Sequence, residues 1–214
     1  VHMPLREITG RDLETAVDLV EATSDTGSFM SFSSSLKRNA IKLSKICNDL
    51  RLLSSGPQAG FGEINLPARQ AGSSIMPGKV NPVVPEVVNQ VAFAVAGADV
   101  TVTMAVEGGQ LQLNAFEPVI AHSIFQSITW MRRAMRTLRV NCVDGITANR
   151  DRLGAMVGAS VGVVTALTPS IGYAASAALA KTALLSGRSV ADMGVEAGLI
   201  TKVEVVEHIS AENK

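Results

Sequence analysis

The chain has 214 residues, with 19 basic and 19 acidic side chains, so its formal net charge at pH 7 is zero. Aromatic residues make up only 4% of it. A neutral, aromatic-poor chain lacks the basic surface and stacking side chains of a nucleic-acid-binding protein, and the charge that holds a protein on an anionic membrane. Its two cysteines, Cys47 and Cys142, have no metal-ligand spacing and are expected to be buried, reduced thiols.

Two amphipathic segments come first along the chain. Apolar residues separated by acidic ones indicate a short helix over residues 13–21. Over residues 29–53, apolar side chains recur every three or four positions, and charged side chains fill the other face. This spacing predicts a long helix, which Ser-Ser-Gly-Pro at residues 54–57 ends.

A long irregular connection follows over residues 57–82. Glycines and prolines break regular structure within its last twelve residues, and irregular connections of this length are commonly functional. Almost the only polar groups between those breakers are two adjacent hydroxyls, one ammonium and one carboxamide. We therefore expect residues 71–82 to form a mobile, anion-binding lid, with candidate residues Ser73, Ser74, Lys79 and Asn81.

The segment after the lid predicts a helix over residues 83–106 that is apolar nearly all round. Asn81 and Pro82 form a typical helix start, with the Asn81 amide as the capping group. A helix with apolar side chains on every face must be enclosed on every side. Because a chain of this size with few helices cannot easily enclose it alone, we expect an oligomer whose subunits share a central bundle.

The rest of the chain predicts further helices and no convincing strand. One long helix is expected over residues 119–143, and two short ones over residues 189–196 and 201–209. The sequence therefore predicts an all-α fold. Its expected domains are a central helical bundle over residues 1–143, which carries the lid, and a small helical domain over residues 144–214.

One uncharged stretch raises the question of a membrane span. Residues 153–180 carry no charged side chain, but glycines and a proline interrupt them, and alanine and serine replace the larger apolar residues that a span prefers. We expect a buried helix pair there. Because the first residues also do not read as a signal peptide, the expected location is cytoplasmic, with no membrane partner.

Residues 72–82, Gly-Ser-Ser-Ile-Met-Pro-Gly-Lys-Val-Asn-Pro, match the signature of the fumarase/aspartase superfamily of lyases. The match is long and specific. Two flanks of the signature resemble the aspartate ammonia-lyase branch more than class II fumarases, namely residues 63–71 and 83–91. Residues 109–114 and 145–149 also resemble that branch. The resemblance extends over nearly the whole chain, but it covers only the C-terminal half of the family's pattern.

The resemblance implies a homotetramer built on a shared bundle of long helices, with each active site formed by three subunits. It implies reversible anti-elimination of ammonia from L-aspartate to give fumarate, without an organic cofactor and without a metal site. Ser73 matches the family's catalytic base. The other matching positions are Ser74, which binds the β-carboxylate, Lys79, which binds the α-carboxylate, Asn81, which helps to hold the substrate, and Glu86, which orients a histidine of another subunit.

Other readings remain open on the sequence alone. The same scaffold serves fumarate hydratases, and a catalytically silent helical assembly module would also have a bundle and a lid. Other superfamily lyases, which act on argininosuccinate, adenylosuccinate or carboxymuconate, fit the flanks poorly. The upstream segments with which the family binds substrate are not found here, and His122 and His208 lie outside any family motif. We therefore expect the chain to be inactive by itself.

Overall fold

The computed structural model of the chain describes residues 2–56, 58–70 and 80–201, and these residues are predominantly helical, which confirms the all-α prediction. They form two compact units. The first contains Val1–Phe61 and Leu66–Ile146, and the second contains Gly62–Asn65 and Thr147–Lys214. The division into domains over residues 1–143 and 144–214 remains a prediction.

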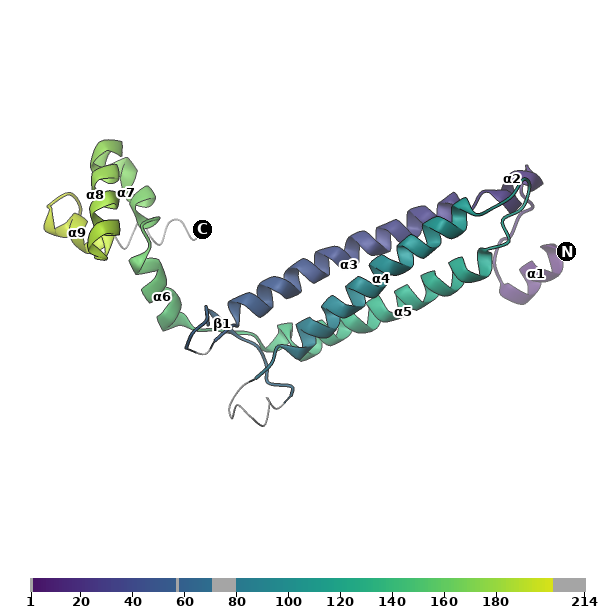
Figure 1. Cartoon of the computed structure of the whole chain (residues 1–214), viewed down its shortest axis with the longest axis horizontal. Coiled ribbons are helices and arrows are strands. Elements are labelled where there is room, and N and C mark those ends of the chain that lie inside the picture. The colour runs from purple at the N-terminus through teal and green to yellow at the C-terminus, as the bar shows by residue number, and fades with distance from the viewer. Residues whose placement is uncertain (1, 57, 71–79, 202–214) are drawn as a thin grey trace. The chain divides into compact units, whose positions relative to one another are not determined.

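Three long helices make up most of the described part of the first unit and lie side by side (Figure 1). They are α3 (Gly27–Leu53), α4 (Val83–Glu107) and α5 (Glu117–Asn141). Their bounds agree closely with the sequence-based ranges, because the apolar periodicity and the breakers at both ends of each helix are strong. Three clusters of buried apolar side chains follow one another along the bundle and hold these helices together.

The two short helices at the start of the chain differ from the prediction. They are α1 (His2–Thr9) and α2 (Leu19–Ser24), so the helix expected over residues 13–21 is wrong. The reason is the Asp18 side chain, which accepts hydrogen bonds from the backbone N–H groups of Val20 and Glu21 at 2.9 and 3.1 Å. This capping starts the helix at Leu19, near the end of the expected segment.

The turn between α4 and α5 is fixed by a buried amide. Asn114 is 1% exposed, and its Nδ2 donates to Thr26 Oγ1 and to the carbonyl oxygens of Ala105 and Val106 at 3.0–3.2 Å. Its Oδ1 accepts from the Phe116 N–H at 2.8 Å. One side chain therefore satisfies the last carbonyls of α4 and the start of α5, and it ties both to α3.

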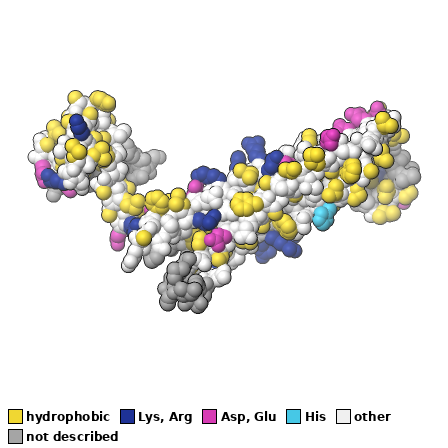
Figure 2. Space-filling view, in the orientation of Figure 1, with side chains coloured by type: hydrophobic (Ala, Val, Ile, Leu, Met, Phe, Trp, Pro, Cys, Tyr) yellow, Lys and Arg dark blue, Asp and Glu magenta, His cyan; other side chains and the backbone are white. Residues whose placement is uncertain are grey.

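Helix α4 is long and apolar enough, by length and composition, to cross a membrane, and α6 and α7 pass the same test as a pair bent by 49°. Within the bundle, however, one face of α4 packs against both α3 and α5. Its other face stays exposed and apolar, with Phe93, Val100 and Met104 each at least 60% exposed. The single chain thus leaves α4 covered on one face only, and Figure 2 shows apolar side chains distributed over the visible surface of the bundle.

The described residues of the second unit contain four shorter helices. They are α6 (Arg150–Ala159), α7 (Val163–Ile171), α8 (Tyr173–Ser186) and α9 (Val190–Glu196). Their core contains Leu167, Leu179, Ala183, Val190 and Ile200. The helix expected over residues 189–196 is confirmed, and the one expected over 201–209 lies outside the described residues. The buried helix pair expected over 153–180 is wrong, because three helices cover this stretch and α6 has no buried residue.

The second unit also holds a short strand pairing that the sequence did not predict. The dipeptides β1 (Ile64–Asn65) and β2 (Thr147–Ala148) pair antiparallel. Side-chain amides support this pairing: Asn65 Nδ2 donates to Asn149 Oδ1 at 2.6 Å, and Asn149 Nδ2 donates to the Gly62 carbonyl at 2.6 Å. Two-residue strands are too short to produce an alternating pattern that a sequence analysis would detect.

Candidate functional site

The predicted site residues are only partly described by the structure. Ser73, Ser74 and Lys79 lie outside the described residues, whereas Asn81 and Glu86 lie within them. The described part of the candidate site therefore consists of the two flanks of the signature and the end of the bundle on which they rest.

Asn81 lies just before α4 and is half-buried. Its carbonyl oxygen accepts a hydrogen bond from the Val83 N–H at 2.9 Å. The N-cap position is occupied by Pro82, and no side-chain hydrogen bond caps the helix there. The prediction that the Asn81 amide caps α4 is therefore wrong, because the proline shifts the start of the helix one residue further along. The Asn81 side chain is left with its amide uncommitted to capping.

Glu86 lies in the first turn of α4 and is half-buried. Its backbone N–H donates to the Pro82 carbonyl at 3.1 Å, which closes the first turn. A carboxylate at this position interacts favourably with the positive end of the helix dipole. Within the residues that the structure describes, Glu86 forms no salt bridge.

The flank before the signature is held by an arginine that the sequence analysis did not single out. Arg69 Nε donates to the Asn141 carbonyl at 3.0 Å, and its Nη2 donates to the Val140 carbonyl at 3.4 Å. Both carbonyls belong to the last turn of α5, where a cation also meets the negative end of the helix dipole. Arg69 therefore fastens the chain, two residues before Ala71, to the end of α5.

Two apolar contacts strengthen this attachment. Leu66 packs against the buried cluster that contains Cys47, Val88 and Leu138. Pro67 lies over Gly145 so closely that a Cβ added to this glycine would be 2.6 Å from Pro67 Cγ. Any larger residue than glycine at position 145 would push this flank away.

The two flanks meet at a shallow depression on the end of the bundle. Residues of the segment before the signature, of the segment after it and of the end of α5 line it together. Its lining residues are Leu66, Pro67, Arg69, Asn81, Pro82, Val83, Val84, Pro85, Asn141 and Cys142.

A buried amide network holds α4 in register with α3 close to this depression. Asn89 is 3% exposed, and its Nδ2 donates to the carbonyl and Oγ of Ser44 at 3.0 and 2.8 Å and to Asn48 Oδ1 at 3.1 Å. Arg51 Nη1 donates to Asn89 Oδ1 at 3.3 Å. These four contacts fix α4 one turn beyond Glu86, so the helix start has a rigid base.

The two thiols near this end are unsuited to nucleophilic chemistry. Cys47 and Cys142 are free, buried, and part of one apolar cluster, as the sequence predicts. Burial, together with the neighbouring Cys142, raises the pKa of Cys47 to about 11, although Arg51 opposes the shift. Burial also raises the pKa of Cys142. Both thiols stay protonated near neutral pH, whereas a reactive cysteine needs a thiolate.

The described residues do not assemble a metal site. They contain no group of three or more His, Cys, Asp or Glu side chains that could hold an ion. His122, the one histidine whose side chain is described, is exposed on α5.

Comparison with known proteins places this arrangement in a family. Residues 1–97 match the family described as "Lyase", and residues 163–213 match "Fumarase C C-terminus". An aspartate ammonia-lyase of Pseudomonas aeruginosa is 58% identical over 209 residues, which cover 98% of this chain and 44% of that protein. The chain thus spans less than half the length of this relative.

Solved structures agree with the sequence relationship. The "fumarate lyase:delta crystallin" of Brucella melitensis, bound to cobalt, superposes with a TM-score of 0.90 at 54% identity, over 96% of this chain and 45% of that one. A class II fumarase of Schistosoma mansoni superposes with a TM-score of 0.81 at 31% identity, over 96% of this chain and 44% of that one. The chain therefore belongs to the fumarase/aspartase superfamily of lyases.

Proposed function

We propose that this chain forms part of an aspartate ammonia-lyase, which eliminates ammonia reversibly from L-aspartate to give fumarate. The observation that carries the proposal is the difference in identity between the two branches of the family. The P. aeruginosa aspartate ammonia-lyase is 58% identical to this chain, whereas the S. mansoni fumarase, compared over a similar stretch, is 31% identical.

The proposed reaction is an anti-elimination. A base removes a proton from the carbon next to the β-carboxylate, the two electrons of that C–H bond pass into the carboxylate, and the resulting dianion then expels the amine. The developing negative charge is the difficult part of this reaction. Donors aimed at that carboxylate must therefore supply much of the rate enhancement.

Ser73 is the proposed base. A serine hydroxyl abstracts a proton only when it is ionised, and each unit by which its pKa is lowered requires about 1.4 kcal/mol of differential stabilisation. The proposed sources are the Lys79 ammonium, backbone N–H groups of the signature segment, and the positive end of α4, which starts at Val83. Exclusion of water from the site would strengthen all three.

The remaining signature residues are proposed to hold the substrate. Ser74 donates to the β-carboxylate, Lys79 pairs with the α-carboxylate, and Asn81 supplies a neutral hydrogen-bonding group. The Asn81 amide is suited to this role because it does not cap α4. Glu86 is proposed to orient a histidine of another subunit, for which its half-buried carboxylate at the start of α4 is available.

The proposed assembly is a homotetramer in which three subunits complete each site. It is supported by the uncovered face of α4. Phe93, Val100 and Met104 are 63%, 60% and 61% exposed, and their spacing of seven and four residues places them on one stripe of the helix. An apolar stripe opposite a packed face is what a helix shared between subunits requires.

The experiment that tests the activity uses the complete protein. It is incubated with L-aspartate and, separately, with L-malate, and fumarate is followed by its ultraviolet absorbance. We expect fumarate from aspartate alone. Fumarate from malate at a comparable rate would instead favour a hydratase, and the absence of turnover with both substrates would favour a silent assembly module.

The role of Ser73 is tested by Ser73→Ala in the same protein. We expect loss of elimination with the assembly intact, as measured by light scattering. The matched control is Ser35→Ala, at an exposed serine of α3, which is expected to leave turnover unchanged. Wild-type turnover in Ser73→Ala would remove Ser73 as the base. The 214-residue chain alone is expected to give no turnover, and steady fumarate production from it would contradict the shared-site proposal.

A further inference from the structure

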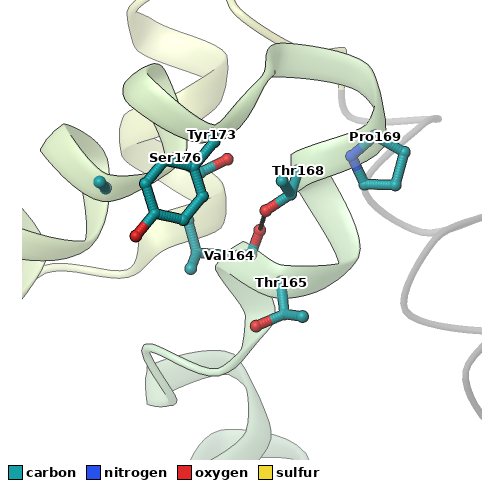
Figure 3. Close-up of a pocket in the computed structure, with 7 residues that line it drawn as sticks. Val164, Thr165, Thr168, Pro169, Tyr173 and Ser176 are labelled. Atoms are coloured by element: carbon teal, nitrogen blue, oxygen red, sulfur yellow. Dashed lines mark hydrogen bonds between the residues drawn. The ribbon is translucent and has the colours of Figure 1, made fainter.

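The second unit contains an open cavity between α7 and α8, with a volume of about 550 Å³. Its lining comes from α7 and the first half of α8, two helices that Gly172 joins with a positive φ of 79°. Figure 3 shows these side chains, which are Val164, Thr165, Thr168, Pro169, Tyr173, Ser176 and Ala177. Cavities of this size commonly accommodate small molecules.

One side chain in this cavity has an unmet hydrogen-bonding need. Ser176 is 3% exposed, and its Oγ is, among the residues that the structure describes, the one buried side-chain nitrogen or oxygen without a hydrogen-bond partner. Figure 3 shows this side chain reaching from α8 toward Thr168 on α7. A buried hydroxyl without a partner is unfavourable, and buried polar groups in folded proteins nearly always have one. The hydrogen-bonding capacity of this hydroxyl, which belongs to a residue that lines the cavity, is therefore unused.

The rest of the lining limits the chemistry of that ligand. None of the seven lining residues carries a charge, so the cavity offers nothing to compensate the desolvation of an anion such as a dicarboxylate. Thr168 Oγ1 already donates to the Val164 carbonyl at 3.0 Å, which leaves it able to accept only. Tyr173 is 81% exposed and places an aromatic ring beside the cavity, next to apolar surface from Val164, Pro169 and Ala177.

We propose that this cavity is a binding site for a small neutral molecule with an aromatic body and one hydroxyl group. The ring would pack against Tyr173 and the apolar wall, and the hydroxyl would pair with Ser176 Oγ. Thr168 Oγ1 offers a second acceptor for the same hydroxyl. This inference concerns binding alone and does not depend on the lyase activity.

The chain contains a single tyrosine, so tyrosine labelled with ¹³C gives one ring signal set that reports on this cavity. The probes are benzyl alcohol, toluene, which lacks the hydroxyl, and benzoate, which is charged. We expect benzyl alcohol to shift the Tyr173 signals saturably, and to bind about three- to tenfold more tightly than toluene, as one neutral hydrogen bond provides. Benzoate is expected to bind more weakly than benzyl alcohol.

The Ser176→Ala variant tests the assigned hydroxyl. It is expected to fold normally, because removing this hydroxyl breaks no hydrogen bond. Benzyl alcohol should then bind only as tightly as toluene, and the affinity of toluene should be unchanged. A preference for benzyl alcohol that survives in Ser176→Ala would overturn the proposal, as would the absence of a saturable shift in the wild-type chain.

A second pair of variants tests the location independently of Ser176. Ala177→Trp fills the cavity from α8 and should abolish the shifts caused by benzyl alcohol. Ala178→Trp places the same side chain at the neighbouring exposed position, which does not line the cavity, and should leave binding intact. Equal binding by both variants would show that the probe binds elsewhere and would overturn the proposal.

Discussion

The ion pair between Lys37 on α3 and Asp99 on α4 predicts that removing one partner destabilises the chain more than removing the other. Asp99 forms a salt bridge with Lys37 and accepts a hydrogen bond from Ser34 Oγ at 3.2 Å. The Asp99 side chain is 3% exposed, whereas that of Lys37 is 42% exposed. Burial by itself would raise the pKa of Asp99, but hydrogen bonds from Lys37, Ser33 and Ser34 and the charge of Lys37 outweigh it and lower this pKa.

The difference in exposure between the two side chains determines how much stability each substitution should cost. Lys37→Met leaves a buried carboxylate without its cation, and breaking such a pair costs about 3–5 kcal/mol. We expect the lower end, about 3 kcal/mol, because the serine hydroxyls remain. Asp99→Asn leaves an ammonium that already reaches water, and its amide still accepts from Ser34. The expected cost is therefore about 1 kcal/mol, as for a partly exposed pair.

The pH dependence of stability provides a second, independent test of this ion pair. In the wild type the native pKa of Asp99 lies below its ordinary value of 3.8, so the pair stabilises the fold above that value and this stability is lost as the pH falls through the lowered pKa. Lys37→Met removes the hydrogen bond and the charge of Lys37, both of which lower this pKa, while burial still opposes ionisation. We therefore expect protonation of Asp99 to cost this variant less stability than it costs the wild type. The difference in unfolding free energy between the wild type and Lys37→Met should therefore become smaller from pH ~7 to pH ~4.

The assay is urea unfolding of each variant at both pH values and at one fixed chain concentration, because association also changes apparent stability. Lys42→Met, at an exposed lysine of the same helix, is the matched control and should change stability by no more than about 0.5 kcal/mol. If Asp99→Asn destabilises the chain as much as Lys37→Met does, the argument from burial is refuted.

Three further predictions concern the bundle. Asn114→Ala should destabilise the chain by about 2–3 kcal/mol in urea unfolding, because it leaves the last carbonyls of α4 and the Phe116 N–H unpaired; a change below about 0.5 kcal/mol would contradict this role. Cys47 and Cys142 should resist alkylation by iodoacetamide at pH ~8 in the folded chain, because burial keeps both thiols protonated, and should react in urea. Mass spectrometry measures the labelling. Rapid labelling of the folded chain would contradict this prediction. Phe93→Ser, at a side chain 63% exposed in the single chain, should weaken association in sedimentation while leaving helix content unchanged; an unaltered association state would argue against the α4 stripe as an interface.

The parts of the fold that the sequence predicts well are those with a long local pattern. Helices α3, α4 and α5 each combine many turns of periodic apolar residues with Gly, Pro or Ser at their ends. The start of the chain was predicted less well, since one aspartate at residue 18 decides where α2 begins, and a similar acidic residue stands at several neighbouring positions. A cap is a single hydrogen-bonding choice, and periodicity carries no information about it.

The candidate site shows more clearly that a local sequence pattern predicts only part of the structure. Its chemical residues, from Ser73 to Asn81, are recognisable because a contiguous motif contains them. The residues that anchor the motif are not recognisable in this way. Arg69 and Asn141 are 72 positions apart, and Asn65 and Asn149 are 84 positions apart, so only the folded chain brings these pairs together. Long-range hydrogen bonds of this kind leave no local signature in a single sequence.

These anchors suggest how the bundle serves the proposed chemistry, and Arg69 allows the idea to be tested. A reacting group must be held within a fraction of an ångström of its productive position, and loops gain such precision only from a rigid support. Here the flank before the signature is tied to the end of α5 through Arg69, and the flank after it leads directly into α4, whose register Asn89 fixes. The support for both ends of the signature is therefore the same end of one packed bundle.

We expect Arg69→Ala in the complete protein to lower turnover of aspartate at least about tenfold, because the misplacement of one flank spreads to the residues that follow it. The melting temperature should change little, since the two lost hydrogen bonds are exposed. Arg136→Ala, at an exposed arginine of α5, is a control for the loss of an arginine as such. Arg69→Lys restores the charge at the helix end but not the two directed N–H groups, so it should recover only part of the activity. Full activity in Arg69→Ala would mean that the signature is positioned without this anchor, and a large fall in melting temperature would mean that Arg69 supports the fold of the bundle and not the site.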